Sequence, residues 1–232
     1  DGFITPEKDL QLATWNDRCV HCHTTAGAPR AEEDGSFKTE VADLGIACEA
    51  CHGPGQAHVS ARRSPLNRYA RYFDDGPDTT IVNPVRVPPA RANDVCAQCH
   101  SISERGPHFR QSGSTFRAGD RLSDSRRILT RKDVMTLPND LPADIAPVAR
   151  KSREDWARKR FWTDGEVRVT GREFSQMSQS KCHQGGELTC LSCHSMHNAP
   201  ADDQLRTDKA GDKSCKGCHE VPSDHTHHVP GS

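Results

Sequence analysis

Five motifs of the form C-x-x-C-H constrain this 232-residue chain more than any other feature of its sequence. Every C-x-x-C pair in the chain is followed directly by a histidine, and this is the signature of covalent c-type haem attachment. The two cysteine sulfurs form thioethers to the haem, and the histidine binds the iron on one face. The predicted thioether residues are Cys19, Cys22, Cys48, Cys51, Cys96, Cys99, Cys190, Cys193, Cys215 and Cys218. The predicted proximal iron ligands are His23, His52, His100, His194 and His219.

Zinc sites and disulfides are the two alternatives for paired cysteines. Zinc takes four ligands in a tetrahedron, so it has no use for a histidine after every pair and would leave one of five pairs over. Disulfides explain neither the spacing nor the histidines. Composition agrees with haem, because 33 % hydrophobic residues and a mean hydropathy of -0.79 make a poor protein-only core. Five haem c groups supply the missing apolar surface.

Further histidines predict the sixth iron ligands. His197 follows His194 by three residues, which span at most about 10 Å, too little to reach round one haem to its other face. His197 is therefore expected on the iron of a neighbouring haem, and the same reasoning applies to His58 beyond the Gly53–Gly55 break. Two imidazole ligands suit electron transfer, whereas an open position permits substrate binding. The distal candidates are His58, His197, His225, His228 and His108.

Three other features have structural interpretations. His21 lies inside a motif and is expected to be structural or solvent-facing, and Cys182, the one cysteine outside the motifs, is expected to be a buried thiol. Arginine outnumbers lysine, and guanidinium forks suit the haem propionates. Codon usage is the alternative explanation for the arginine excess.

The expected fold is mainly α with much irregular structure and little β, organised around the five haems as a single domain over residues 1–232. A segment at about 101–189 carries no attachment motif and reads as an insertion. Residues 24–38 read as a loop and 164–170 as a short hairpin or strand. Hydrophobic spacing predicts helices over 6–23, 39–51, a stretch from about 56 that carries His58, 65–73, 90–100, 119–130, 148–162 and 171–182.

Charge and hydropathy exclude some partners. The net charge of -1 and the lack of a basic stripe argue against nucleic acid, and no apolar run approaches the roughly 20 residues of a membrane helix. The chain starts at Asp1 without a leader, so we expect an exported product whose signal peptide has been removed. Covalent haem attachment of this type occurs outside the cytoplasm, which predicts a periplasmic or extracellular location.

Three stretches, LGIACEACHGPGQAH from Leu44, FWTDG from Phe161 and LTCLSCHSMH from Leu188, resemble the multihaem cytochromes c of the cytochrome c-554 or doubled C-x-x-C-H group. That group is related in haem arrangement to pentahaem nitrite reductases and hydroxylamine oxidoreductases. The resemblance implies a helical, loop-rich fold with stacked and perpendicular haem pairs. It also implies that His58, His197 and the pair His225 and His228 are distal ligands. Longer relatives carry further motifs on both sides, so N- and C-terminal parts are expected to be missing here.

These features predict a carrier of single electrons between other cytochromes or redox proteins, with no catalytic residue. One alternative is an oxidoreductase of a small nitrogen or sulfur compound at an open haem. All five proximal positions are histidine and the only tyrosines are Tyr69 and Tyr72, which favours the carrier. Another alternative is a subunit of a larger cytochrome wire or filament, or a homo-oligomer.

Overall fold

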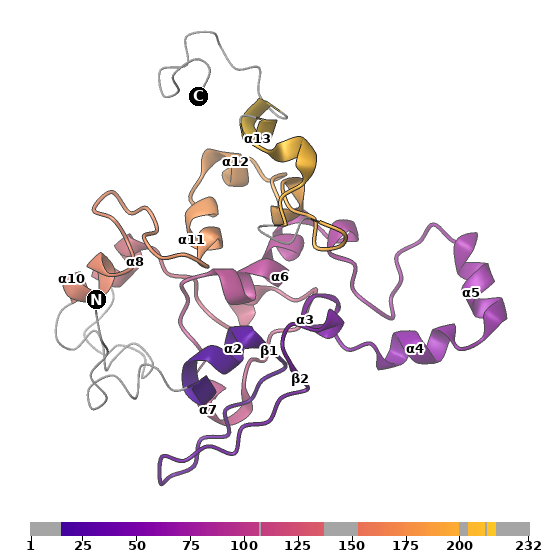
Figure 1. Ribbon diagram of the computed structural model, residues 1–232, viewed down its shortest axis with the longest axis horizontal. Coiled ribbons are helices and arrows are strands. Elements are labelled where there is room, and N and C mark those ends of the chain that lie inside the picture. The colour runs from indigo at the N-terminus through magenta and orange to yellow at the C-terminus, as the bar shows by residue number, and fades with distance from the viewer. Residues whose placement is uncertain (1–14, 107, 137–152, 200–203, 212, 217–232) are drawn as a thin grey trace. The chain divides into compact units, whose positions relative to one another are not determined.

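The computed structural model describes residues 15–106, 108–136, 153–199, 204–211 and 213–216. By its internal contacts the chain divides into two compact units, Asp1–Glu187 and Leu188–Ser232, and each is described by itself (Figure 1). The single domain over residues 1–232 stays a prediction.

Short helices joined by irregular segments make up most of the described chain, which confirms a mainly helical fold with little sheet. The helices of the first unit are α2 (Val20–His23), α3 (Cys48–His52), α4 (Gln56–Arg62), α5 (Pro65–Tyr72), α6 (Pro89–His100), α7 (Phe109–Ser112), α8 (Arg131–Thr136), α10 (Arg153–Arg158), α11 (Glu173–Met177) and α12 (Lys181–Gln184). A π-helical turn covers Trp15–Cys19, and 3-10 turns cover Pro84–Arg86 and Leu122–Asp124. The second unit has α13 (Lys213–Lys216) and 3-10 turns at Cys190–Ser192 and Thr207–Lys209.

Three attachment motifs coincide with helix ends. Helices α2, α3 and α6 all end at the histidine of a motif, as predicted for α6. Pro89 opens α6, where its missing N–H costs nothing, and Gly53 ends α3 with a φ of 74° that glycine adopts without strain. Within a helical turn, residues i and i+3 are neighbours, so each helical C-x-x-C spacing turns its two thiols to one side.

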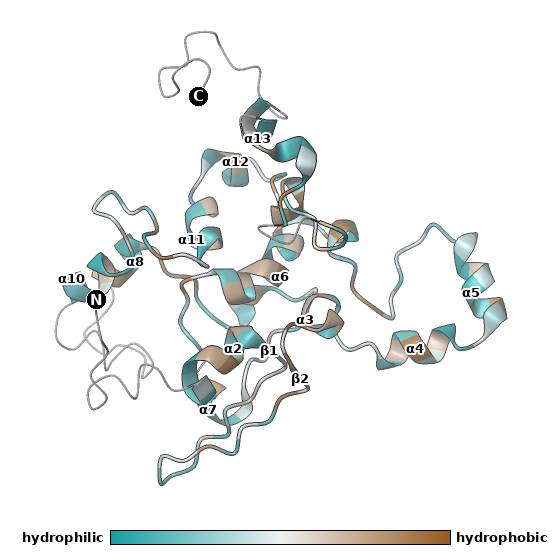
Figure 2. Cartoon of the chain, in the orientation of Figure 1, coloured by the Kyte–Doolittle hydropathy of each residue, from teal (hydrophilic) through white to brown (hydrophobic). Residues whose placement is uncertain are grey.

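Two apolar clusters form the core of the first unit. Both draw mainly on the segment at about 101–189 that carries no motif, and hydrophobic stretches elsewhere are short (Figure 2). The larger cluster is made of Ile102, Leu129, Val134, Trp156, Ala157 and Phe161. The smaller one is made of Ala97, Phe116, Leu122 and Phe174. The segment expected to be an insertion therefore supplies most of the buried apolar side chains.

The helix predicted over 39–51 is wrong, because residues 24–44 form an antiparallel hairpin. Strand β1 (Thr24–Thr25) pairs with β2 (Asp43–Leu44), and isolated bridges continue the hairpin outward. Thr25 fixes the end of the hairpin, since its hydroxyl donates to the carbonyl of Gly45 at 2.9 Å and accepts from the N–H of Ala47 at 2.8 Å. Gly45, with a φ of 117°, breaks any helical path, so α3 begins only at Cys48.

The helix predicted over 119–130 is also wrong. Only the turn Leu122–Asp124 forms, and the chain then runs extended as Ser103 bridges Ile128. Burial of Leu122 and Leu129, which belong to different clusters, pulls the segment out of a single helix. The hairpin predicted near 164–170 is confirmed by the bridge between Phe161 and Val167. Helices α4 and α5 also form where predicted.

The matched substitutions Leu129→Ala and Leu66→Ala test this core. Leu129 is fully buried, so its truncation should lower the free energy of unfolding by about 2–5 kcal/mol. Leu66 is 79 % exposed, and its truncation should change that energy by less than about 0.5 kcal/mol. Denaturant titration of both variants measures the difference, and equal effects would contradict the assignment of the core.

Candidate haem site

Three attachment motifs of the first unit converge on Gln98, which occupies an internal position of the third motif. The carbonyl oxygen of Gln98 accepts hydrogen bonds from His21 Nε2 of the first motif at 2.8 Å and from Arg126 Nη1 at 3.0 Å. The side-chain amide of Gln98 donates to the carbonyl of Ala50 in the second motif at 2.9 Å. One residue thus joins the helices that carry three of the five motifs.

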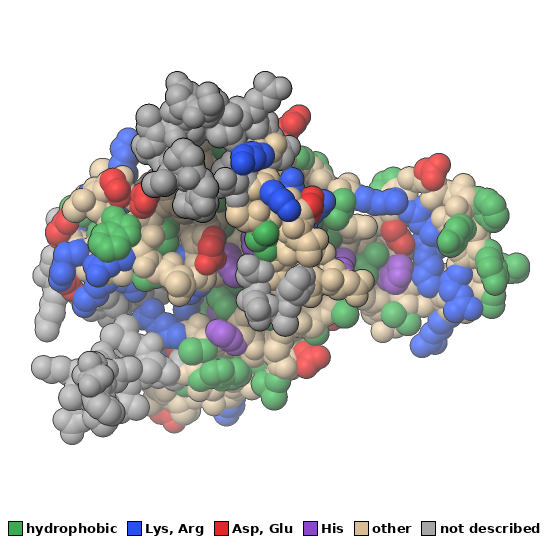
Figure 3. Space-filling model, turned by 45° about the horizontal axis from the view of Figure 1, so that its top comes forward, with side chains coloured by type: hydrophobic (Ala, Val, Ile, Leu, Met, Phe, Trp, Pro, Cys, Tyr) green, Lys and Arg blue, Asp and Glu red, His purple; other side chains and the backbone are tan. Residues whose placement is uncertain are grey.

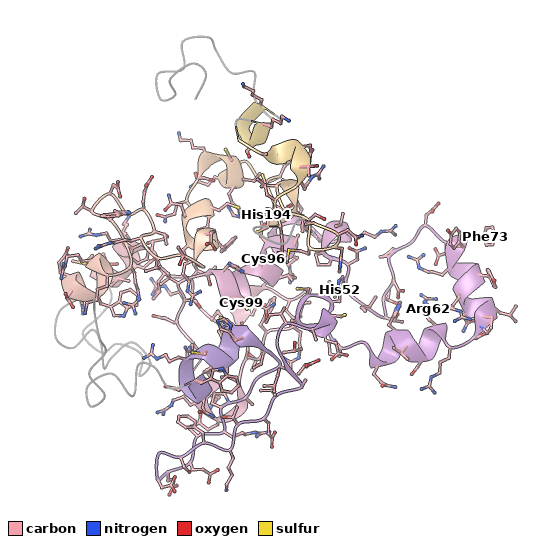
Figure 4. All side chains as sticks on the ribbon, viewed as in Figure 1. His52, Arg62, Phe73, Cys96, Cys99 and His194 are labelled. Atoms are coloured by element: carbon pink, nitrogen blue, oxygen red, sulfur yellow. The ribbon has the colours of Figure 1, made fainter. Side chains whose placement is uncertain are left out.

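The cysteines of these motifs lie close together as well. Cys22 Sγ lies 3.8 Å from the carbonyl oxygen of Cys99, and Cys96, Cys99 and His52 lie on the adjacent helices α6 and α3 (Figure 4). Contact with Cys99 and the charges of Arg172 and Arg126 lower the pKa of Cys22 to about 6. Contact with Cys22 and burial raise the pKa of Cys99. A low pKa favours the thiolate, which is the nucleophilic form of cysteine.

Burial and a neighbouring cysteine also shift the pKa of a thiol in the second motif. Burial is the first cause of the raised pKa of Cys51, and the neighbouring Cys48 adds to it. The remaining motif cysteines of the first unit are half-buried, except for Cys48, which is exposed.

Three predicted iron ligands each have an oxygen partner at Nδ1 of the imidazole ring. His52 Nδ1 bonds the carbonyl oxygen of Val82 at 2.7 Å, and His100 Nδ1 bonds Glu173 Oε2 at 2.9 Å. His58 Nδ1 lies 3.2 Å from Thr80 Oγ1 and 3.3 Å from Asp78 Oδ2. An oxygen partner at Nδ1 assigns the proton to that nitrogen and the lone pair to Nε2, the arrangement found in metal-binding histidines. All three rings therefore have the form that binds iron through Nε2.

A cavity of about 710 Å³ adjoins His52. Its volume falls within the range of about 300–1,000 Å³ typical of cofactor pockets. Val82 holds His52 at a second point, because its N–H donates to the backbone carbonyl of His52 at 3.1 Å. The other side chains on the cavity wall include Tyr72, Arg71 and Arg86. Apolar and cationic groups thus lie together beside a predicted iron ligand.

Two kinds of observation test whether these residues fit haem. Among the described residues, the buried side-chain polar atoms without a hydrogen-bond partner are Arg18 Nε and Ser101 Oγ, directly before Cys19 and directly after His100. Large apolar side chains also stay exposed, as at the right of Figure 3. They include Leu66, Tyr69, Tyr72 and Phe73 on and beside α5, with exposures of 70–90 %. A flat apolar cofactor with carboxylate groups satisfies both features, so the residues fit haem.

His21 has a structural role. Burial, followed by the charges of Arg126 and Arg105, lowers the pKa of His21 to about 3, so the ring is neutral at pH 7. The ring stands edge-on to Phe109, with 5.2 Å between the centroids. This environment agrees with a structural rather than an iron-binding residue.

The buried thiol predicted at Cys182 is wrong, since Cys182 is exposed on α12. Ser180 caps this helix by accepting from the N–H of His183, and the His183 ring packs edge-on against Phe174 at 5.6 Å between centroids. His183 therefore takes the inward position that was expected for Cys182.

The second unit contains the fourth motif. Cys190–Ser192 forms a tight turn that Thr189 caps, and His194 bridges Leu205. His197 lies exposed before Asn198, which has a positive φ of 59°. The backbone of Cys215 belongs to α13, whereas Cys218, His219, His225 and His228 lie outside the described residues. His108 lies exposed at the start of α7, and its role as a ligand stays a prediction, as do the roles of all the other motif and distal histidines.

Sequence reasoning missed the oxygen partners that orient the imidazoles. Glu173 lies 73 residues from His100, and Val82 lies 30 residues from His52. Gln98 occupies a motif position where any residue is allowed, so its bridging role had no sequence signal. The doublet of Asp78 and Thr80 also matched no motif.

One family model matches part of the chain. Residues 4–53, which span the first two motifs, match the family model described as cytochrome c554 and c-prime. This match supports a c-type cytochrome with covalently bound haem, a class of electron-transfer proteins. No curated protein matches the chain.

A solved structure with distant similarity is an undecaheme cytochrome from the S-layer of Carboxydothermus ferrireducens, at 22 % identity and a TM-score of 0.37. The aligned region covers 89 % of this chain and 29 % of that protein, so the chain spans less than a third of its length. Among the described residues, none of the helices has the length and apolar character needed to cross a membrane.

The substitution Gln98→Ala tests the junction of the three motifs. Loss of the amide bond to Ala50 should destabilise α3 locally by about 1 kcal/mol, which is roughly a fivefold faster amide exchange over residues 48–52. Hydrogen exchange with mass spectrometry measures this rate. Gln111→Ala, at an exposed position of α7, is the matched control and should leave the exchange over 48–52 unchanged. Equal rates in the two variants would exclude Gln98 as the link.

Proposed function

We propose that this protein is a pentahaem c-type cytochrome that carries single electrons along closely packed, mostly bis-histidine haems between redox partners outside the cytoplasm. The convergence of three attachment motifs on Gln98 is the observation that carries the proposal. Motifs held this close place the attachment points of different haems beside one another. A succession of adjacent cofactors is what a conductor needs.

The protein's part in electron transfer is to position the cofactors and to tune their potentials, while the one-electron chemistry belongs to haem when it is bound. Oxygen partners at Nδ1 fix the rings of His52, His58 and His100. Rings fixed in this way would hold a bound haem iron with little rearrangement between its oxidation states. Such rigidity favours rapid electron exchange over substrate binding.

Ten cysteines and five motif histidines hold the haems in this proposal, as assigned from the sequence. His58, His197, His225, His228 and His108 are the candidates for the sixth ligands. The partners are other cytochromes or redox proteins. Attachment chemistry outside the cytoplasm favours a periplasmic or extracellular location.

Haem count and spin state test the proposal together. Mass spectrometry of the native protein should give the chain mass plus five haems, and electron paramagnetic resonance should show mainly low-spin iron. Stepwise reduction in a potentiometric titration should account for five electrons. A smaller haem count contradicts the pentahaem assignment, and a high-spin haem with turnover of nitrite or hydroxylamine favours the oxidoreductase alternative.

The variants His58→Ala and His58→Met test the best-placed distal candidate. His58→Ala removes a ligand and should convert one haem from low-spin to high-spin, while the mass still shows every haem attached. His58→Met offers a thioether instead, and the haem should stay low-spin with a raised midpoint potential. Optical and paramagnetic resonance spectra separate these outcomes. An unchanged spectrum in both variants would remove His58 from the ligand set.

A further inference from the structure

Four arginines lie beside the first and third motifs without an acidic partner among the described residues. Arg18 directly precedes Cys19, Arg126 and Arg172 bond the third motif, and Arg160 lies near Arg18 and Arg172. Several arginines elsewhere form ordinary ion pairs instead. These pairs include Arg30 with Glu40, Arg127 with Asp133 and Arg131 with Glu154.

The contacts of the four arginines are to neutral groups. Arg126 is only 6 % exposed and donates to the carbonyl of Gln98 at 3.0 Å and to Ser114 Oγ at 2.7 Å. Arg172 Nη1 donates to the carbonyl of Cys99 at 3.0 Å. Arg18 Nε is buried and has no hydrogen-bond partner. Carbonyls and hydroxyls satisfy the hydrogen bonds of these arginines but carry no negative charge to compensate theirs.

Arg160 shows that these charges repel one another. Its guanidinium stacks on Trp156 at 4.0 Å from the ring centroid and is half-buried. Burial, followed by the charges of Arg18 and Arg172, lowers the pKa of Arg160 to about 10. Placing like charges together in a partly desolvated region is costly unless an anion lies among them. The arrangement therefore indicates an anionic ligand.

We infer that Arg18, Arg160 and Arg172 form a binding site for the propionate carboxylates of haem at the junction of the first and third motifs. The inference rests on the proposed function, because that function supplies the ligand. Guanidinium groups bind carboxylates through paired N–H donors, and Arg18 has a buried donor available for this purpose. Arg126, which already bonds Gln98 and Ser114, supports the site by its charge.

The site affects the midpoint potential of the haem as well as its position. Positive charge near a haem stabilises the reduced iron, so these arginines raise the midpoint potential of the haem whose carboxylates they bind. None of the three belongs to the attachment motifs or to the candidate ligands. In this inference the haem site therefore includes residues that contact the propionate groups of the cofactor.

Arg18→Gln and Arg18→Lys in the holoprotein test the site, with Arg30→Gln as the matched control in the exposed hairpin. Arg18→Gln should lower one midpoint potential, Arg18→Lys should lower it less, and Arg30→Gln should leave all the potentials unchanged. The propionate bands in the resonance Raman spectrum should shift in Arg18→Gln and not in the control. Arg160→Gln should lower the same potential.

Haem count by mass keeps this test separate from that of the proposed function. A protein with no covalent haem overturns the proposed function itself. A protein that keeps all its haems, with unchanged potentials and propionate bands in both Arg18→Gln and Arg160→Gln, overturns the inference alone. If Arg18→Gln does not fold, the charge-conserving Arg18→Lys decides through the propionate bands, because lysine cannot reproduce the paired donors.

Discussion

The hydrogen bonds of Gln98 are the interaction on which the first unit depends. Helices α2, α3 and α6 carry three attachment motifs, and α2 and α3 are far shorter than the roughly 12–15 residues that an isolated helix needs in water. Tertiary contacts must therefore fix them. Gln98 does so with both its backbone carbonyl and its side-chain amide, and each bond reaches a different motif. Such bonds set the relative orientation of the motifs, which hydrophobic contact alone leaves loose.

The distribution of apolar side chains explains why polar contacts carry this role. Both core clusters depend on the segment at about 101–189, and before it the buried hydrophobic side chains are few and mostly small, as Val20, Ala92 and Val95 illustrate. Helix α5 meanwhile exposes large apolar side chains such as Leu66 and Tyr72. The segment without motifs thus acts as the scaffold. The part of the chain before this segment, which carries three motifs, depends on hydrogen bonds and on the cofactors it is proposed to hold.

Local signals in the sequence predicted those helix ends that are determined by neighbouring residues. Helix α6 begins at Pro89 and ends at a motif, and α4 follows a glycine break, so both were predictable. The helix expected over 39–51 failed because Thr25, more than 20 residues away, holds the backbone at Ala47 in an extended path. Likewise, nothing in the spacing of motifs reveals that Glu173 meets His100. Long-range hydrogen bonds leave no periodic pattern in the sequence, and they determine most of the geometry of the candidate site.

The oxygen partners of the imidazoles also make the predicted irons unequal. His52 bonds a neutral carbonyl, whereas His100 bonds the carboxylate of Glu173. A carboxylate partner raises the basicity of a ligating imidazole, and a more basic ligand stabilises ferric iron and lowers the potential. The arginines near the third motif act in the opposite direction on the same neighbourhood. In the proposed chain of haems, a carboxylate partner at one axial ligand and a neutral carbonyl at another would make the potentials differ without any change in the attachment motif.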